Sequence, residues 1–300
     1  MLDMLMFMAA PFAACLILVG MHGYLGLHVL LRQVIFVDLS LAQIAALGTV
    51  VAFLFGHEVG SPASFAFSLG AAVLGALIFS LTRTRTHETK VPQEAIIGIT
   101  YVMASAAALL VADRAPEGAE HIKELLAGSI LWITWPTVLR NLLIYSAVGV
   151  FHYFFRKRFM LISEDPERAY ESGMRVWLWD FLFYVSFGVV ITISVEIGGV
   201  LMVFAQLVAP AIIALNSSDR WGKRIAIAWA VGFLASAVGL IASYQVDFPS
   251  GPAIVCALGL FLLLFGGWRA LRPARAGAAL EPSSPAPLPR AGEGSKAKIA

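Results

Sequence analysis

Residues 32–56 read RQVIFVDLSLAQIAALGTVVAFLFG, and after the first two residues only Asp38, Ser40, Gln43 and Thr49 are polar. About 20 apolar residues, each rising 1.5 Å along a helix axis, are enough to cross a bilayer. The stretch therefore predicts a membrane-spanning helix. A carboxylate inside such a helix is costly, so Asp38 is expected to face the protein interior and to mark a path for an ion or polar substrate. The alternative is that Asp38 lies near the membrane edge and only hydrogen-bonds a neighbouring helix.

The composition of the whole chain agrees with this prediction. Hydrophobic residues make up 59% of the 300 residues and charged residues only 13%. Such a chain cannot cover itself with polar surface in water, which is typical of an integral membrane protein. No lysine or arginine precedes Arg32, so the basic start of a cleaved signal peptide is missing and the first span is expected to be retained.

Apolar runs bounded by charged residues, Gly or Pro divide the chain into about nine predicted spans. They lie near 4–30, 34–56, 63–82, 94–112, 136–155, 176–196, 198–216, 225–244 and 252–270. The run 124–135 is too short to cross and predicts a half-helix or interfacial segment. Tight junctions are expected at Arg32-Gln33 and at 197–199, where two glycines permit a sharp reversal. The predicted fold class is an all-α polytopic membrane protein.

The cations predict the orientation of these spans. With the N-terminus outside and the C-terminus inside, only Arg114 and Lys123 lie in outer loops, with Arg140 near the outer end of its span. All other lysines and arginines fall on the inner side, as the positive-inside rule requires. The transmembrane domain is expected to be 1–271, and the Pro- and Ala-rich segment 272–300 is expected to be a disordered cytoplasmic tail.

Motifs for enzyme chemistry are missing from the sequence. It contains no G-x-x-x-x-G-K-[ST] phosphate loop, no HExxH or CxxC metal motif and no nucleophile elbow. The chain is therefore not expected to hydrolyse a nucleotide by itself. The pattern favours a passage through the membrane over a catalyst.

Three segments, taken in order, carry a resemblance to a known family. They are FVDLSLAQIAALG (36–48), EDPERAYESGM (164–174) and GGVLMVFAQLVAPAIIAL (198–215), with QEAIIGI (93–99) as a weaker fourth. The three are similar to the Gly-Asp-Ala-Leu-Ser-His-Ala-x-Leu-Pro-Gly, Asp-Pro-Glu-x-Ala-x-x-x-Gly and Val-Gly-x-Leu-Leu-Val-x-Ala-Leu-Leu-x-x-Pro-Ala segments of one family. That family comprises the permease subunits of bacterial ABC importers for zinc, manganese and iron(II).

The resemblance implies a pathway for a divalent metal ion across the cytoplasmic membrane of a bacterium. Zinc and manganese are the ions most expected. Two permease copies would form the pathway, cytoplasmic ATPase subunits would drive it, and an extracytoplasmic binding protein would deliver the ion. The chain itself would be no enzyme and would hold no covalently bound cofactor. The cytoplasmic element 162–175 would dock on the ATPase, although a charge run is otherwise usually a solvated loop. The coupling residues implied are Glu164, Asp165, Pro166, Glu167 and Gly173.

One departure from the family pattern affects the expected metal site. The pattern sets an Asp and a His four residues apart, on one face of a helix. The corresponding positions here are Asp38 and Gln43, five apart, and the histidine is missing. Five residues correspond to about 140° around a regular helix, so the two side chains would not converge. A one-residue π-bulge would bring these two candidate metal ligands back together, which is our hypothesis.

Further ligands are expected from the preceding span. Counted from the Arg32-Gln33 turn at 1.5 Å per residue, His28 and Asp38 both lie roughly 7–8 Å deep, and His22 and Gln43 both roughly 16 Å deep. Antiparallel helices could present each pair together. Imidazole and carboxylate suit zinc or manganese, whereas an amide oxygen favours harder cations. The alternative is that both histidines are hydrogen-bonded packing residues.

Three polar residues of later spans are interpreted as peripheral. Asp180 and Glu196 would lie near opposite ends of one span, where water or lipid headgroups reach them. His152, between Phe151 and Tyr153 near the inner interface, is typical of an aromatic belt.

Two other transport functions remain open at this point. One is an ABC permease for a metal chelate such as a siderophore or cobalamin, which the loss of the histidine favours. The other is a secondary transporter driven by protons, in which Asp38 would be the titrating group. Uptake that continues without ATP hydrolysis would exclude both ABC functions.

Overall fold

The computed structural model describes residues 2–58, 60–83, 91–113 and 130–271, and in this part of the chain it contains helices and no strand. Its helices are α1 (Leu2–Leu31), α2 (Val37–Leu54), α3 (Pro62–Leu81), α4 (Gln93–Ala112), α6 (Trp135–Glu164), α7 (Pro166–Glu171), α8 (Val176–Ser217), α9 (Trp221–Val246) and α10 (Ser250–Leu271). A single 3-10 turn, η1 (Ile130–Trp132), precedes α6. The expected tail 272–300, the first half (124–129) of the predicted half-helix 124–135 and the outer cations Arg114 and Lys123 lie outside the described residues.

Eight of the described helices are long and apolar enough to cross a membrane. Every one of the nine predicted spans falls on one of them, because α8 contains the two ranges 176–196 and 198–216 in one run of 42 residues. Gly199 divides that run with φ 74° and ψ 160°, which are not helical values. The prediction of an all-helical protein with about nine spans is therefore confirmed. The orientation, with the N-terminus outside, stays a prediction.

The chain reverses direction at Gly199. Phe183, in the first half of α8, has its ring centroid 5.8 Å from that of His28. Ala211, in the second half, lies so close to Gly26 that a Cβ added to the glycine would be 3.2 Å from the alanine Cβ. A straight helix would separate residues 183 and 211 by about 42 Å. Because both contact neighbouring turns of α1, the two halves must fold back on each other, at a backbone conformation that is essentially restricted to glycine.

The hairpin between α1 and α2 is closed by a Schellman motif. Gln33 adopts a left-handed conformation with φ 57°. The amide of Gln33 donates to the Leu30 carbonyl at 3.1 Å, and the amide of Val34 donates to the Val29 carbonyl at 3.2 Å. Val29 and Val34 are both buried, which supplies the hydrophobic contact that accompanies this motif. The tight junction predicted at Arg32-Gln33 is confirmed.

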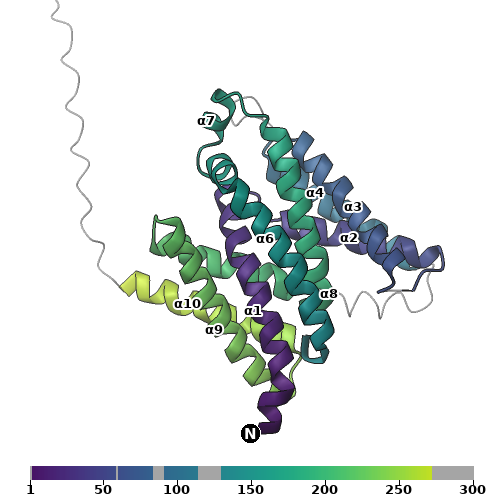
Figure 1. Cartoon of the computed structure of the whole chain (residues 1–300), viewed down its shortest axis with the longest axis vertical. Coiled ribbons are helices and arrows are strands. Elements are labelled where there is room, and N and C mark those ends of the chain that lie inside the picture. Colours follow the sequence, from purple (N-terminus) through teal and green to yellow (C-terminus); the bar gives the residue numbers. More distant parts are fainter. Residues whose placement is uncertain (1, 59, 84–90, 114–129, 272–300) are drawn as a thin grey trace, which may run out of the picture.

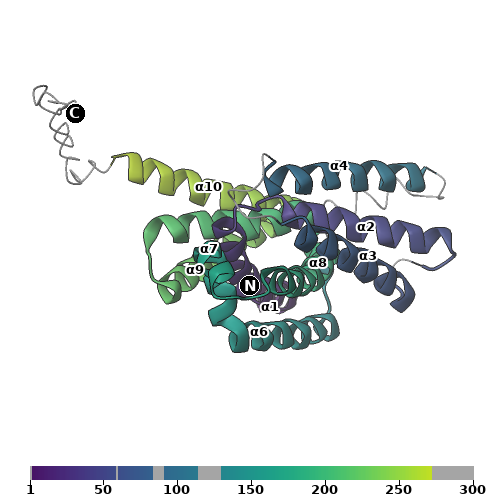
Figure 2. The ribbon, with the colours of Figure 1, turned by 90° about the horizontal axis from the view of Figure 1, so that it is seen from above.

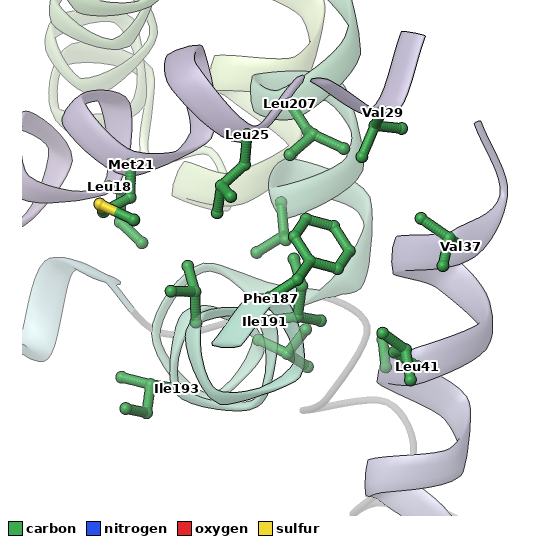
Figure 3. Packing of buried hydrophobic residues seen from close by; sticks show 14 of the residues in the cluster. Leu18, Met21, Leu25, Val29, Val37, Leu41, Phe187, Ile191, Ile193 and Leu207 are labelled. Carbon is green, nitrogen blue, oxygen red and sulfur yellow. The ribbon is translucent and has the colours of Figure 1, made fainter. Parts of the chain in front are cut away.

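Helices α1 and α8 form a central pair. Around it lie α6, the group of α2, α3 and α4, and the pair of α9 and α10. Helix α1 packs against α8, α6 and α9, and the hairpin of α2 with α3 and α4 extends to the opposite side from α9 and α10 (Figures 1 and 2). In the core, Leu25 of α1, Leu41 of α2 and Phe187 of α8 belong to one cluster of buried apolar side chains, part of which Figure 3 shows. The outward faces of α4, α6 and α10 expose large apolar side chains, which fits surfaces that contact lipid or another membrane chain.

Candidate functional site

Asp38 lies in the first turn of α2 with only 2% of its surface exposed. Its Oδ1 accepts a hydrogen bond from the Leu39 amide at 2.6 Å. The positive end of the helix dipole at an N-terminus favours a carboxylate at this position. Within this chain the side chain therefore points into protein and not towards lipid headgroups.

The π-bulge hypothesis for α2 is wrong. The helix is regular from Val37 to Leu54. Asp38 is buried and Gln43 is half-buried, as expected for two side chains about 140° apart around an α-helix. The bulge is not needed because the buried residues of α2, among them Leu41 and Ala45, already follow a helical spacing. Asp38 and Gln43 of one chain therefore cannot contact the same ion from one helix face.

His22 is fully buried in α1, with Nδ1 2.7 Å from the Leu18 carbonyl oxygen. A carbonyl only accepts, so Nδ1 carries the proton, and in the neutral ring Nε2 then carries the lone pair. Nε2 has no hydrogen-bond partner within the described part of the chain. Histidines that bind metal commonly adopt this arrangement, in which the other ring nitrogen donates to a backbone carbonyl.

His28 belongs to a polar cluster between α1 and α6. The Ser163 hydroxyl donates to the Phe159 carbonyl at 2.9 Å, so its oxygen accepts from His28 Nδ1 at 2.7 Å. The His28 ring is also surrounded by aromatic rings, with Tyr24 and Trp221 at centroid distances of 4.7 and 4.8 Å. Like His22 Nε2, His28 Nε2 has no hydrogen-bond partner within the described residues, so His28 stays a candidate ligand in an aromatic setting.

No three His, Cys, Asp or Glu side chains gather closely enough to hold a metal ion among the residues that the structure describes. The expected pairing of His28 with Asp38, and of His22 with Gln43, remains a prediction. A single copy of the chain thus presents individual candidate ligands and no complete metal site in its described part.

Asp180 lies at the centre of a buried ion network that the sequence did not indicate. Its Oδ1 is 2.7 Å from Arg32 Nη1 and its Oδ2 is 2.7 Å from Arg83 Nη1. The Asp180 side chain is 0% exposed, as is that of Arg32, so the expectation that water or headgroups reach Asp180 is wrong. The carboxylate is buried because two guanidinium groups from other helix ends neutralise it. Glu196, in contrast, is exposed as expected.

Arg32 extends this network towards α6. Its Nε donates to Ser163 Oγ at 2.9 Å, and its guanidinium carbon lies 4.0 Å above the centre of the Phe183 ring. Burial lowers the pKa of Arg32, and the Asp180 carboxylate opposes that change. Arginine remains protonated in either case, so the network keeps a permanent positive charge.

His152 is buried inside the bundle, so its assignment to an aromatic belt is wrong. Only 2% of the residue is exposed. Nε2 lies 2.8 Å from Ser186 Oγ, Nδ1 lies 3.3 Å from the Tyr24 hydroxyl, and the ring stacks on Phe159 at 4.5 Å. A histidine with partners for both nitrogens from two other helices acts as a polar link in the bundle.

The element predicted to couple to an ATPase forms a short helix after α6. Asp165 accepts a hydrogen bond from the Arg168 amide at 3.0 Å and caps α7, and Pro166 occupies the first turn. Gly173 ends the element with φ 75°. An acidic cap followed by proline is a helix start signal, which explains why α7 begins at Pro166.

One side of α7 is exposed to solvent, and the other side packs against the helix bundle. Ala169 is fully buried, whereas Glu164, Asp165, Glu167 and Gly173 are exposed. Glu164 also joins α9, because its Oε1 accepts from Trp221 Nε1 at 2.7 Å. The predicted coupling residues are therefore accessible to a partner while α7 is held against the helix bundle.

Comparison with known proteins finds relatives along most of the chain. The sequence model described as the ABC 3 transport family matches residues 4–266. The manganese transport system membrane protein MntC of Listeria innocua is 23% identical over 248 residues, which cover 81% of this chain and 84% of the relative. The chelated iron transport system membrane protein YfeC of Yersinia pestis is 28% identical over 208 residues, which cover 69% of each chain.

Solved structures share the fold. PsaBC from Streptococcus pneumoniae, determined in complex with Fab, superposes with a TM-score of 0.73 at 20% identity, over 88% of this chain and 93% of that one. An inward-facing conformation of a metal-chelate type ABC transporter superposes with a TM-score of 0.64 at 18% identity. The arrangement of helices seen here is thus that of ABC permeases.

Proposed function

Because the chain belongs to the ABC 3 transport family, we propose that it is the membrane subunit of an ATP-driven importer for a divalent metal ion. The family match over residues 4–266 carries this proposal. The names of the relatives support manganese and iron among the cargoes, and the ligand chemistry of carboxylate and imidazole adds zinc. ATP hydrolysis is proposed to belong to a separate subunit, which the lack of a phosphate-binding loop in this sequence supports.

The importer is proposed to contain two copies of this chain. One copy contributes a buried carboxylate at Asp38 and no cluster of three ligands within its described residues. A twofold axis would present the same residues from both copies and would double the number of ligands. Asp38 is the first candidate contact for the ion, with Gln43 and His22 as further ligands along the path and His28 as the weakest candidate.

The α7 end of the protein is proposed to face the cytoplasm of a bacterium. Cations gather there, and the positive-inside rule then directs this end inwards. Examples are Arg83, Arg168, Arg220 and Arg269. In this orientation the exposed acidic residues of α7 would meet the ATPase, and an extracytoplasmic binding protein would deliver the ion to the opposite face.

Metal accumulation in cells tests this function. Cells that express the chain with its ATPase and binding protein are expected to accumulate manganese, zinc or iron(II), and this uptake should stop when the ATPase carries an inactive phosphate loop. Uptake that persists without ATP hydrolysis would favour a proton-driven transporter. Uptake of a siderophore or cobalamin complex in place of the free ions would favour the chelate permease, which the chelated iron relative makes the second candidate.

A further inference from the structure

The last two residues of α6 connect the start of α7 to two other helices, α1 and α9. Ser163 Oγ accepts from Arg32 Nε at 2.9 Å and from His28 Nδ1 at 2.7 Å, so it joins the end of α1. Glu164 accepts from Trp221 of α9. Only Glu164 and Asp165 therefore lie between Ser163, which bonds to the buried ion network, and Pro166, the first residue of α7.

The same network reaches the helix that carries Asp38. Arg32 is bonded to Asp180, and Asp180 is bonded to Arg83, which follows α3. Arg32 is also part of the tight turn that leads directly into α2 at Val37. A displacement of Ser163 would therefore act on the turn that positions the first residues of α2.

The bonds in this series suit the transmission of movement. They are buried and charge-assisted, which makes them stronger and more directional than bonds in water. One donor, Arg32 Nη2, has no acceptor in the described part of the chain although the side chain is fully buried. A buried donor without a partner is costly. A shift of the helices that brings an acceptor to Arg32 Nη2 would therefore be favourable.

We propose that Ser163 and Arg32 are positioning residues that transmit movement of α7 to the α1–α2 turn and so to Asp38. This inference rests on the proposed function, because it requires that an ATPase acts on α7. The bond between Ser163 and Arg32 couples the two elements, and Asp180 holds Arg32 in the orientation that makes this bond.

The experiment compares metal ions transported per ATP hydrolysed in proteoliposomes that contain the complete importer. Ser163→Ala removes the acceptor of the Arg32–Ser163 hydrogen bond, and Arg32→Lys removes its donor. The lysine keeps the positive charge next to Asp180. Each is expected to lower the ratio about tenfold, a usual size for coupling between sites, while ATP hydrolysis itself stays within about twofold. The double variant should be no worse than either single one, because both remove one shared interaction. Ser163→Thr, which keeps the hydroxyl, should retain the wild-type ratio.

The control is Ser217→Ala, since among the described residues the Ser217 hydroxyl bonds only to the Ile213 carbonyl of its own helix. An unchanged ratio in both Ser163→Ala and Arg32→Lys would overturn the inference. Variants that no longer co-purify with the ATPase would overturn it too, in favour of a static structural role. If the wild-type importer moves no divalent metal at all, the proposed function fails, and this result is distinct from an unchanged ratio.

Discussion

Asp38 and Gln43 lie about 140° apart around α2, because the helix is uninterrupted from Val37 to Leu54. The two side chains of one copy therefore contact different surroundings. We expect Gln43→Ala to lower metal uptake by less than about threefold, which is below roughly 0.7 kcal/mol. Initial uptake rates at low metal concentration measure this effect. A loss as large as that of an Asp38 variant would instead indicate that Gln43 and Asp38 of two copies share one ion.

The Asp180 network is expected to dominate the stability of the α7 end of the bundle. Asp180→Asn leaves the buried Arg32 and the partly exposed Arg83 without their carboxylate, and breaking a buried pair in this way costs about 3–5 kcal/mol. Thermal unfolding of the purified protein in detergent should show a clear decrease in Tm. Asp219→Asn is the matched control, because Asp219 pairs with Arg224 at 3.5 Å while it is fully exposed, and its Tm should not change. Equal Tm values for the two variants would contradict the importance of the network.

Gly199 is expected to tolerate no side chain. Its φ of 74° with ψ of 160° lies in a region that costs other residues about 1–3 kcal/mol. Gly199→Ala should therefore lower the Tm and the yield of folded protein. Gly149→Ala serves as the comparison, because within the part of the chain that the structure describes a Cβ there would meet only Met21 Sδ, at an ordinary distance of 3.7 Å. If both variants were equally stable, the reversal of α8 would not depend on glycine.

The exposed acidic surface of α7 is expected to contribute to ATPase binding. Glu167→Lys reverses a charge on this surface and should reduce the amount of ATPase that co-purifies by about tenfold, or roughly 1.4 kcal/mol. Glu58→Lys makes the same change beyond the other end of α2, at an exposed position, and should leave binding intact. Equal binding by both variants would argue that α7 is only a solvated loop.

Features set by neighbouring residues could be predicted from the sequence. The apolar runs identified the spans, the pair Gly198-Gly199 indicated the reversal, and Asp165 followed by Pro166 indicated the start of α7. Each of these signals is local, because it depends on length, on φ freedom or on helix capping.

The interior polar contacts could not be predicted in this way. The arginines that bind Asp180 are 148 and 97 residues away in sequence, and the Tyr24 that contacts His152 is 128 residues away. Nothing near Asp180 distinguishes a carboxylate with two buried partners from one that reaches headgroups. Such pairs arise from helix packing, and a single sequence contains no local signal for them.

ATP-driven uptake of manganese or zinc into proteoliposomes, compared for the wild-type importer and Asp38→Asn, tests the central claim most directly. Asparagine keeps the size of the side chain and removes its charge, so the two complexes should assemble equally well. Because the carboxylate is proposed to contact the passing cation, uptake by Asp38→Asn should be at least about tenfold slower, which corresponds to roughly 1.4 kcal/mol. Uptake at the wild-type rate by Asp38→Asn would contradict the account.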